Sequence, residues 1–365
     1  MSTPHSHSLS FGSLNCRSLI KSHNSNAQSL FIRHLRSLSL SLLAVQESHA
    51  ITLANQESLN MQFQCSSSIW TNHCGLICFD PNLTVTNHET PVNLDQRVIS
   101  TTIQHSQNAF PPFNLLVIYA PAAHSARQRF FLHLADFIHP TTLSNQTRTL
   151  VMGDFNQTPK PDGADWHSTL HRFFDDALSS DPGLQGIPTF THSGNGSRSV
   201  IDFIYCSPDI SADICHPQVS HIPSDWTDHA LLKCLWRVGS SRGPSPCWRA
   251  KPHLASIPEF VKHLYTNIDQ FLAHQHCDTP TAVWEEIKCI AKATAQRFMR
   301  KRPSVLERQT RHLMSRRNRL LRLSQTSAVE SCSALLEELA IVEHKLSLIQ
   351  REQALRLELR AKSTW

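Results

Sequence analysis

The chain has 365 residues, of which 40% are apolar, enough for one large domain with an appendage and a substantial core. This composition excludes disorder throughout. The net charge of +5 hides an asymmetry, because residues 1–240 hold 13 Lys and Arg against 17 Asp and Glu, whereas residues 241–365 hold 21 against 12. An excess of acidic residues in the first part is typical of a domain whose carboxylates surround a cation. The basic C-terminal part is typical of a segment that binds a polyanion, although a solvated helix face has the same composition.

Residues 1–13 have no Lys or Arg and no apolar core of the length of a signal peptide, so we expect no secretion. Residues 1–9 are rich in Ser and His, and we expect a disordered terminus there. The longest apolar-leaning stretch, residues 30–45, is interrupted by Arg33, His34 and Arg36, so no membrane span is expected. The 11 Cys residues stand singly and are odd in number, which favours a reducing, intracellular compartment.

Short apolar runs of strand length recur over residues 10–238 and predict a mixed α/β domain. Several runs are apolar for four or more residues, as in strands that are buried on both faces. One amphipathic helix is expected between them, over residues 126–137. The predicted strands are LLAVQ (42–46), GLICF (75–79), RVISTTIQ (97–104), NLLVIYA (114–120), TLVMGDF (149–155), SVIDFIYC (199–206) and ALLKCLWRV (230–238).

A Gly, Ser and Pro-rich linker over residues 239–256 separates this domain from a basic helical extension, residues 257–365. Arginines dominate residues 297–322, as in a nucleic-acid-binding surface or, equally, a solvated helix face. Residues 331–360 are amphipathic, but Gln353 and Arg356 interrupt the apolar seam. We therefore expect a helical hairpin rather than a coiled coil, and no oligomer is predicted.

Polar residues repeatedly follow the predicted strands, where side chains from neighbouring strands converge on one edge of a sheet. They are of the types that phosphodiester cleavage needs. They comprise Asn15, Gln46 with Glu47, Tyr119, Asp154 with Asn156, Asp202, and Asp228 with His229.

Each step of phosphodiester hydrolysis has a candidate in this set. Mg²⁺ prefers carboxylate and amide oxygens, so Glu47 with Asn15 and Asp228 would form an open metal site, with Mn²⁺ as the alternative ion. Asp154 would take the proton from the attacking water, and Asn156, two residues along the strand, would hold a phosphate oxygen on the same face. Asp202 would orient His229, and Tyr119 would donate a hydrogen bond near the phosphate or the leaving group.

The ordered series N, QE, YAP, GDFN, SxIDF, DH resembles the endonuclease/exonuclease/phosphatase superfamily over residues 10–238. Within it, the chain looks most like the N-terminal endonuclease of LINE-type non-LTR retrotransposon polyproteins. The extension resembles the linker that leads to a reverse transcriptase, and no YxDD-like polymerase motif follows, as in a truncated copy. The segments that carry the resemblance are LNCRSL, LAVQES, DQRVIS, VIYAPAAHSARQRFF, VMGDFN, PTFTHSGNGSRSVIDFIYCS and GPSPCWRAKPHLASIPEFVKHL.

The resemblance implies a four-layer α/β sandwich of two mixed sheets flanked by helices, which is the DNase I-like fold, with a C-terminal helical extension. It also implies Asn15 and Glu47 at a metal, Tyr119 at the phosphate, Asp154 as general base with Asn156 beside it, and Asp202 supporting His229 next to Asp228. Two positions depart from the family pattern. Val200 stands where Arg or Lys is usual, and Thr227 stands where Ser is usual.

DNA is the expected partner, through Arg198, Arg316 and Arg317, with RNA as an alternative ligand of the basic tail. The expected reaction is Mg²⁺-dependent nicking of target DNA that leaves a 3′ hydroxyl for primed reverse transcription, which would place the protein in the nucleus. Two alternatives stay open. One is another phosphoesterase of the superfamily, such as an abasic-site nuclease or an RNA nuclease. The other is a decayed retroelement fragment that binds nucleic acid without turnover.

Overall fold

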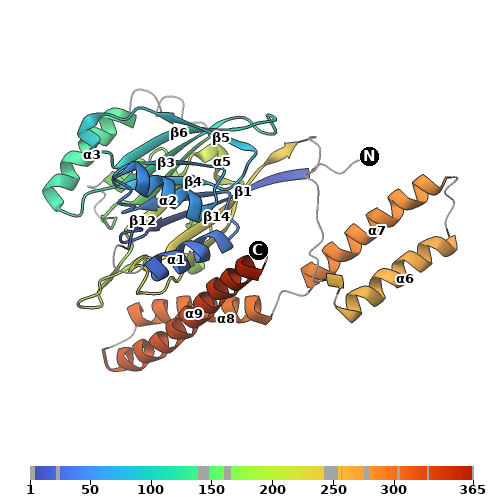
Figure 1. The fold of residues 1–365 in the computed structure, drawn as a ribbon. Helices are drawn as coiled ribbons and strands as arrows, with labels where there is room; N and C mark the ends of the chain where they lie inside the picture. The colour runs from blue at the N-terminus through green and yellow to red at the C-terminus, as the bar shows by residue number, and fades with distance from the viewer. Residues whose placement is uncertain are drawn as a thin grey trace. The chain divides into compact units, whose positions relative to one another are not determined.

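A computed structural model describes residues 5–21, 25–138, 148–159, 166–241, 254–255, 257–274, 279–301, 305–326 and 329–363 (Figure 1). The chain divides into two compact units. The first contains Met1–Arg242 together with Leu313–Trp365, and the second contains Gly243–His312. The expected extension, residues 257–365, is therefore divided between the two units.

Two six-stranded sheets form the centre of the first unit. In spatial order, the first sheet contains β13 (Ile214–Ser220), β14 (Leu231–Ser241), β1 (His5–Asn15), β2 (Leu42–Gln46), β4 (Cys74–Cys78) and β3 (Ser67–Trp70). The second contains β5 (Leu83–His88), β6 (Val98–His105), β7 (Phe113–Tyr119), β8 (Thr149–Asp154), β12 (Asp202–Cys206) and β9 (Asp175–Asp176). Both sheets are mixed, because β1–β2 and β7–β8 are parallel pairs among antiparallel neighbours.

Helices cover the outer faces of the two sheets, which gives the expected four-layer α/β sandwich (Figure 1). Along β2, Leu42 and Ala44 face the core between the sheets, whereas Leu43 and Val45 pack in the cluster that contains the residues of α1 and α2. This alternation is the period of two that a strand imposes on its side chains. The helices and short elements are α1 (Ser25–Ser37), α2 (Leu53–Phe63), α3 (His124–Ile138), α4 (Trp166–Leu170), α5 (Pro208–Ser211), the 3₁₀ turns Val92–Leu94 and Pro182–Leu184, and the small ribbon β10 (Phe190–Thr191) with β11 (Arg198–Ser199).

The seven predicted strands and the predicted helix are present, with ends shifted by up to three residues. β1 begins at His5, so the disordered terminus expected over residues 1–9 is wrong for its second half. β1, β3, β5 and β13 were not among the predicted strands. The last three lie at sheet edges, and each contains partly or fully exposed residues, so none carries the continuous apolar run of a central strand.

The extension is helical. In the second unit, α6 (Pro258–His274) and α7 (Pro280–Lys301) form a hairpin closed by Phe260 and Ala295, with Asn267 donating to Thr294 at 2.8 Å. In the first unit, the end of α8 (Val305–Thr326) and α9 (Val329–Ser363) form the helical hairpin expected there. No described helix is long and apolar enough to cross a membrane.

Candidate active site

The first sheet delivers Asn15 and Glu47 to one edge. β1 and β2 run parallel with Asn15 opposite Gln46, so both strands end at the same edge. Asn15 is fully buried, and Glu47 follows β2 directly with a left-handed φ of 51°. Such a φ in a non-glycine residue is uncommon and is often found at functional sites.

The second sheet delivers Tyr119, Asp154 and Asp202. β7 and β8 run parallel, and Tyr119 at the end of one lies opposite Asp154 at the end of the other. β12 pairs antiparallel with β8, so its first residue, Asp202, also lies opposite Asp154. The sequence predicted Tyr119 and Asp154 near the ends of their strands and Asp202 within the strand 199–206. β12 begins at Asp202, and the register brings the three residues to one point.

Hydrogen bonds join the ends of the two sheets. The Asn15 side-chain amide donates to Glu47 at 3.0 Å and to Asp154 at 2.9 Å. The Tyr119 hydroxyl donates to the same Glu47 oxygen at 3.0 Å. Residues that are far apart in the sequence therefore form one continuous polar network across the sandwich.

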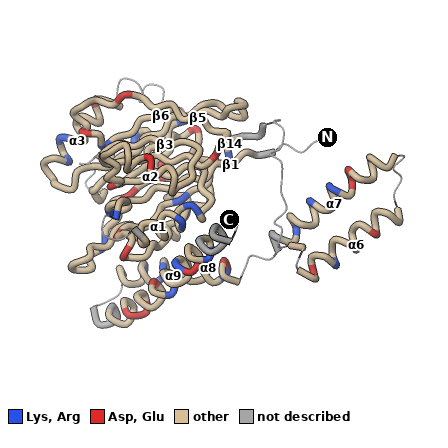
Figure 2. The backbone as a smooth tube through the Cα atoms, viewed as in Figure 1, with Lys and Arg blue, Asp and Glu red and all other residues tan. Residues whose placement is uncertain are grey.

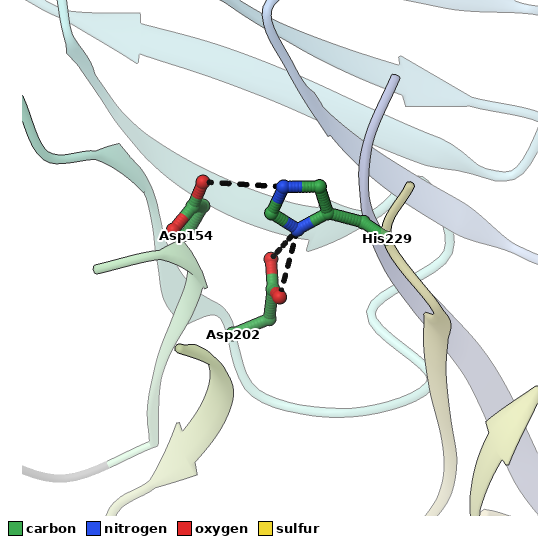
Figure 3. A group of neighbouring side chains, drawn as sticks. All are labelled: Asp154, Asp202 and His229. Carbon is green, nitrogen blue, oxygen red and sulfur yellow. Dashed lines mark hydrogen bonds and ion pairs between the residues drawn. The ribbon is translucent and has the colours of Figure 1, made fainter. Parts of the chain in front are cut away.

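His229 lies between two buried carboxylates, as Figure 3 shows. Its Nδ1 is 2.9 Å from Asp202 Oδ2, and its Nε2 is 4.0 Å from Asp154 Oδ2. The His229 backbone N–H donates to Thr227 Oγ1 at 3.2 Å, and the ring packs on Phe190 with centroids 4.8 Å apart. The bond to Asp202 fixes which imidazole nitrogen faces Asp154, as predicted for a residue that orients a histidine.

Burial and charge set the protonation of this group. Burial by itself lowers the pKa of His229, but Asp202, with smaller effects of Asp154 and Asp228, outweighs it and raises the pKa to about 9. Burial, with the neighbouring Asp202, raises the pKa of Asp154 to about 7 against the opposing effect of His229. Burial and Glu47 together raise the pKa of Tyr119, which keeps its phenol protonated. Two buried carboxylates side by side are short of positive charge, and a cation would supply it.

Asn156 lies beside Asp154, but for a different reason from the predicted one. β8 ends at Asp154, and Asn156 has a left-handed φ of 50°, so the two residues share a turn and not a strand face. The Asn156 backbone N–H donates to Asp154 Oδ1 at 2.7 Å. Its side-chain amide donates to the carbonyl oxygen of Ala120 at 2.8 Å, which fixes the side chain next to the end of β7.

The donor set suits a hard divalent cation, because the carboxylate oxygens of Glu47, Asp154 and Asp202 belong to one network. The Asn15 amide nitrogen faces two of these carboxylates, and its Oδ1 accepts from the Arg17 backbone N–H at 2.9 Å. Among the described residues, Asp154, Asp202 and His229 have candidate ligand atoms within 4.8 Å of one another. The predicted ligands Asn15 and Glu47 join this group through the hydrogen bonds of Asn15. Asp228, the third predicted ligand, lies 3.6 Å from Arg17 Nε.

Thr227, noted in the sequence as a departure from the family pattern, supports the site, and two further supporting residues, Thr189 and Arg97, were missed in the sequence. Thr227 Oγ1 donates to the Asn15 carbonyl at 2.7 Å, and Thr189 Oγ1 accepts from the Asp202 N–H at 3.1 Å. The Arg97 guanidinium lies over the Tyr119 ring, 5.1 Å from its centroid. Arg97 stands in DQRVIS and Thr189 in PTFTHSG, so the motifs that carried the family resemblance contained the signal.

The three arginines predicted to bind nucleic acid occupy different settings. Arg198 lies partly exposed on β11, and the adjacent Val200 packs against the apolar cluster beneath α3. Arg316 forms an exposed ion pair with Glu338. Arg317 is buried and bonds to Glu343 at 2.7 Å, so its guanidinium is engaged within the protein and contact with a nucleic acid is disfavoured. Both signs of charge occur along α8 and α9 (Figure 2).

Comparison with solved structures finds nucleases and related enzymes. The endonuclease domain of TRAS1, a telomere-specific non-LTR retrotransposon, is 14% identical and aligns over 64% of this chain and 99% of its own, with a TM-score of 0.46. A 3′-5′ exonuclease from Neisseria meningitidis is 15% identical over 62% of this chain and 98% of its own, with a TM-score of 0.49. An AP endonuclease from Archaeoglobus fulgidus is 14% identical over 63% of this chain and 100% of its own, with a TM-score of 0.47.

A search of curated proteins finds no match. The sequence profile of the endonuclease/exonuclease/phosphatase family matches residues 12–229, which is more than half of the chain. The matched range begins three residues before Asn15 and ends at His229, so it spans the whole network described above. The chain therefore belongs to the endonuclease/exonuclease/phosphatase family.

Proposed function

We propose that this chain is a divalent-metal-dependent DNA endonuclease that nicks one strand by phosphodiester hydrolysis. The observation that carries the proposal is the network that joins Asn15, Glu47 and Tyr119 to Asp154, and Asp154 to His229 and Asp202, across the two sheets. Membership of a family of nucleases and phosphatases supports the reaction class.

Asn15 and Glu47 would hold a Mg²⁺ ion, with Asp228 as a third oxygen donor. When bound, the ion would neutralise charge on the phosphoryl oxygens as the substrate reacts. Glu47 is suited to this role because it is only partly buried, whereas Asp202 is committed to His229. The buried carboxylates Asp154 and Asp202, whose ligand atoms lie within 4.8 Å of each other, favour a cation nearby.

Asp154 acts as the general base. Burial and the neighbouring Asp202 raise the pKa of its carboxyl above the ordinary aspartate value, which makes the carboxylate a better proton acceptor. Asp154 accepts a proton from the water that attacks phosphorus. A new P–O bond forms and the P–O3′ bond breaks. The departing 3′ oxygen takes a proton from solvent water, so the products are a 3′ hydroxyl and a 5′ phosphate.

His229 and Tyr119 bind the phosphate. With a pKa of about 9, His229 is an imidazolium at neutral pH and donates from Nε2 to a phosphoryl oxygen, while Asp202 fixes the ring through Nδ1. The protonated Tyr119 hydroxyl donates from the opposite side, where it already lies 3.0 Å from Glu47. Donors that are held in place before the substrate arrives cost no rearrangement as charge develops.

DNA is the proposed substrate. The exposed Arg17 and the partly exposed Arg198 are the arginines nearest in sequence to the site residues Asn15 and Asp202. Retrotransposition of a LINE-type element is the proposed role of the nick, supported by the motif segments of the sequence. A substrate panel tests this choice. End-labelled duplex DNA, duplex DNA with one abasic site and single-stranded RNA are incubated with the protein and Mg²⁺, and the product ends are analysed.

Cleavage of intact duplex DNA with 3′ hydroxyl ends supports the endonuclease. Cleavage confined to the abasic duplex or to RNA would reassign the substrate within the family. A folded protein that binds DNA but cleaves none of the three substrates would favour the non-catalytic fragment.

A further inference from the structure

The C-terminal hairpin, defined here as Leu313–Ser363, is packed into the same compact unit as the β-sandwich. Five of its apolar residues belong to the same hydrophobic cluster as the residues between the two sheets. Each of them is at most 5% exposed. They are Leu320, Leu321, Leu339, Val342 and Leu346. The hairpin therefore packs on the β-sandwich through buried apolar side chains, whose removal from water is the main favourable contribution to such contacts.

Polar contacts of α9 converge on His221, which follows β13. The Gln350 side-chain amide donates to the His221 carbonyl at 2.7 Å, and Ser347 Oγ lies 3.0 Å from His221 Nε2. Glu343 Oε1 lies 3.8 Å from His221 Nδ1. One turn further along α9, Arg351 pairs with Asp225. Four residues of α9 thus hold two residues of a single short segment.

Glu343 is the centre of this contact. It also bonds to Arg317 of α8 at 2.7 Å, and the Arg317 side chain is only 6% exposed. A buried guanidinium needs its partner, because an unpaired charge in the interior is strongly unfavourable. The Arg317–Glu343 pair therefore fixes the two helices of the hairpin to each other, and Ser347 and Gln350 on the following turns of α9 attach the hairpin to His221.

The segment that His221 begins, residues 221–229, ends at the catalytic network. Trp226 in its middle stacks on Phe31 of α1, with ring centroids 5.5 Å apart. Thr227 donates to the Asn15 carbonyl at 2.7 Å and accepts from the His229 N–H. A cavity of about 260 Å³ is lined by Arg317 and Glu343 of the hairpin and by Asp228 and His229 of the segment.

We infer that the C-terminal hairpin is a positioning element of the active site, in which Glu343 holds the segment 221–229 and thereby places Asp228 and His229. Glu343 touches no reacting atom and acts through His221. The inference rests on the proposed nuclease function, since it names residues outside the matched family range that tune the same site. Misplacement of a catalytic group by about 1 Å costs on the order of 100-fold in rate, so a docked hairpin raises turnover without binding the substrate.

The test compares Glu343→Gln with Glu338→Gln in the full chain. Both carboxylates pair with an arginine of α8, but the Glu338 pair is exposed and makes no contact with residues 221–229 in the described structure. The kinetic constants kcat and KM are measured for Mg²⁺-dependent cleavage of a duplex oligonucleotide. We expect kcat of Glu343→Gln to fall about 10-fold or more with KM nearly unchanged, and Glu338→Gln to match the wild type. Glu343→Asp, which keeps the charge, should recover part of the loss.

Amide hydrogen exchange of the same proteins provides a readout that does not depend on activity. If the hairpin holds the segment, Glu343→Gln should speed exchange in both 343–351 and 221–229. Leu346→Asp, which places a charge at a fully buried site, should speed it further. Faster exchange in the hairpin alone, together with wild-type kcat, would overturn the inference. If the wild type cleaves no substrate, the proposed function fails, and hydrogen exchange alone tests the inference. Loss of protection in both 343–351 and 221–229 would support the positioning role. Loss of protection in the hairpin alone would refute it.

Discussion

At the scale of single residues, the site depends on how three buried ionisable groups share charge. Asp202 and Asp154 flank His229, and none of the three side chains is more than 5% exposed. With one imidazolium between two carboxylates, the group can keep Asp154 available as a base while Asp202 holds the ring. The different surroundings of the two carboxylates thus give them different roles, Asp154 as base and Asp202 as the partner of His229.

Asp202→Asn should separate these roles. Asn keeps the size of the side chain but removes the charge that does most to raise the pKa of His229, so this pKa should fall from about 9 towards its ordinary range. We expect kcat to fall about 100- to 10,000-fold, because the orientation and the charge of the imidazole are lost together. Steady-state cleavage and the NMR titration of His229 measure the two effects. Asp175→Asn, at an exposed carboxylate on β9, is the control, and equal kcat in the two variants would remove Asp202 from the mechanism.

Thr227 offers a second test, at a position where the family usually has Ser. Its hydroxyl donates to Asn15 and accepts from the His229 N–H, and the residue is 1% exposed. Thr227→Ser keeps both bonds and should retain activity. Thr227→Val has nearly the same shape but leaves two buried backbone groups unpaired, which should cost about 1–3 kcal/mol in the free energy of unfolding. Denaturant unfolding measures the difference, and equal stability of the two variants would show that these bonds contribute little.

At the scale of secondary-structure elements, the central strands could be predicted and their partners could not. Strands such as LLAVQ are buried on both faces, so they appear as continuous apolar runs in the sequence. The bond from Asn15 to Asp154 joins residues far apart in the chain, and no local pattern encodes it. Only the order of motifs in the family resemblance placed the two together. The burial of Arg317 could not be predicted either, because nothing in a run of arginines distinguishes the one that is buried and paired with Glu343.

Gly153, the residue before Asp154, allows β8 to pack closely against β7. Its φ is +150°, and a Cβ built there would lie 1.9 Å from the Ile118 carbonyl oxygen of the parallel strand β7. Gly153→Ala should therefore push β8 away from β7 and destabilise the fold by roughly 3 kcal/mol or more. The control is Gly196→Ala, where no atom lies within 4 Å and only the positive φ opposes the substitution. Thermal unfolding of both variants tests this, and a similar small loss in both would refute the close approach.

At the scale of the whole molecule, the basic tail is not a uniform appendage. The end of α8 and all of α9 belong to the unit that contains the active site, whereas α6, α7 and the start of α8 belong to the second unit. Two buried histidines lie where the hairpin, α1 and the segment 221–229 meet. Burial lowers the pKa of His34 to about 4 with Lys233 nearby, and burial with Arg317 lowers that of His221 to about 4 against the effect of Glu343.

These pKa values predict how stability depends on pH. Above about pH 6.5, both histidines are neutral in the folded and the unfolded chain, so their contribution is constant. Between pH 6.5 and 4 the unfolded chain takes up protons that the folded chain does not, so stability falls, by up to roughly 3 kcal/mol for each histidine at pH 4. His34→Leu should flatten part of this slope, since neither ring nitrogen of His34 has a hydrogen-bond partner in the described structure. The same change at the exposed His344 is the control, and identical melting curves against pH would contradict the prediction.

The most direct test of the central claim is the nicking of supercoiled plasmid by the full chain with Mg²⁺, with and without a chelator, alongside Asp154→Asn and His229→Ala. Both residues belong to the buried group beside the proposed metal site, so each should be required. The wild type should convert the plasmid to relaxed circles. No relaxed circles should form with the chelator or with either variant. Plasmid that stays supercoiled with a folded wild-type protein, or nicking that survives in both variants, would contradict it.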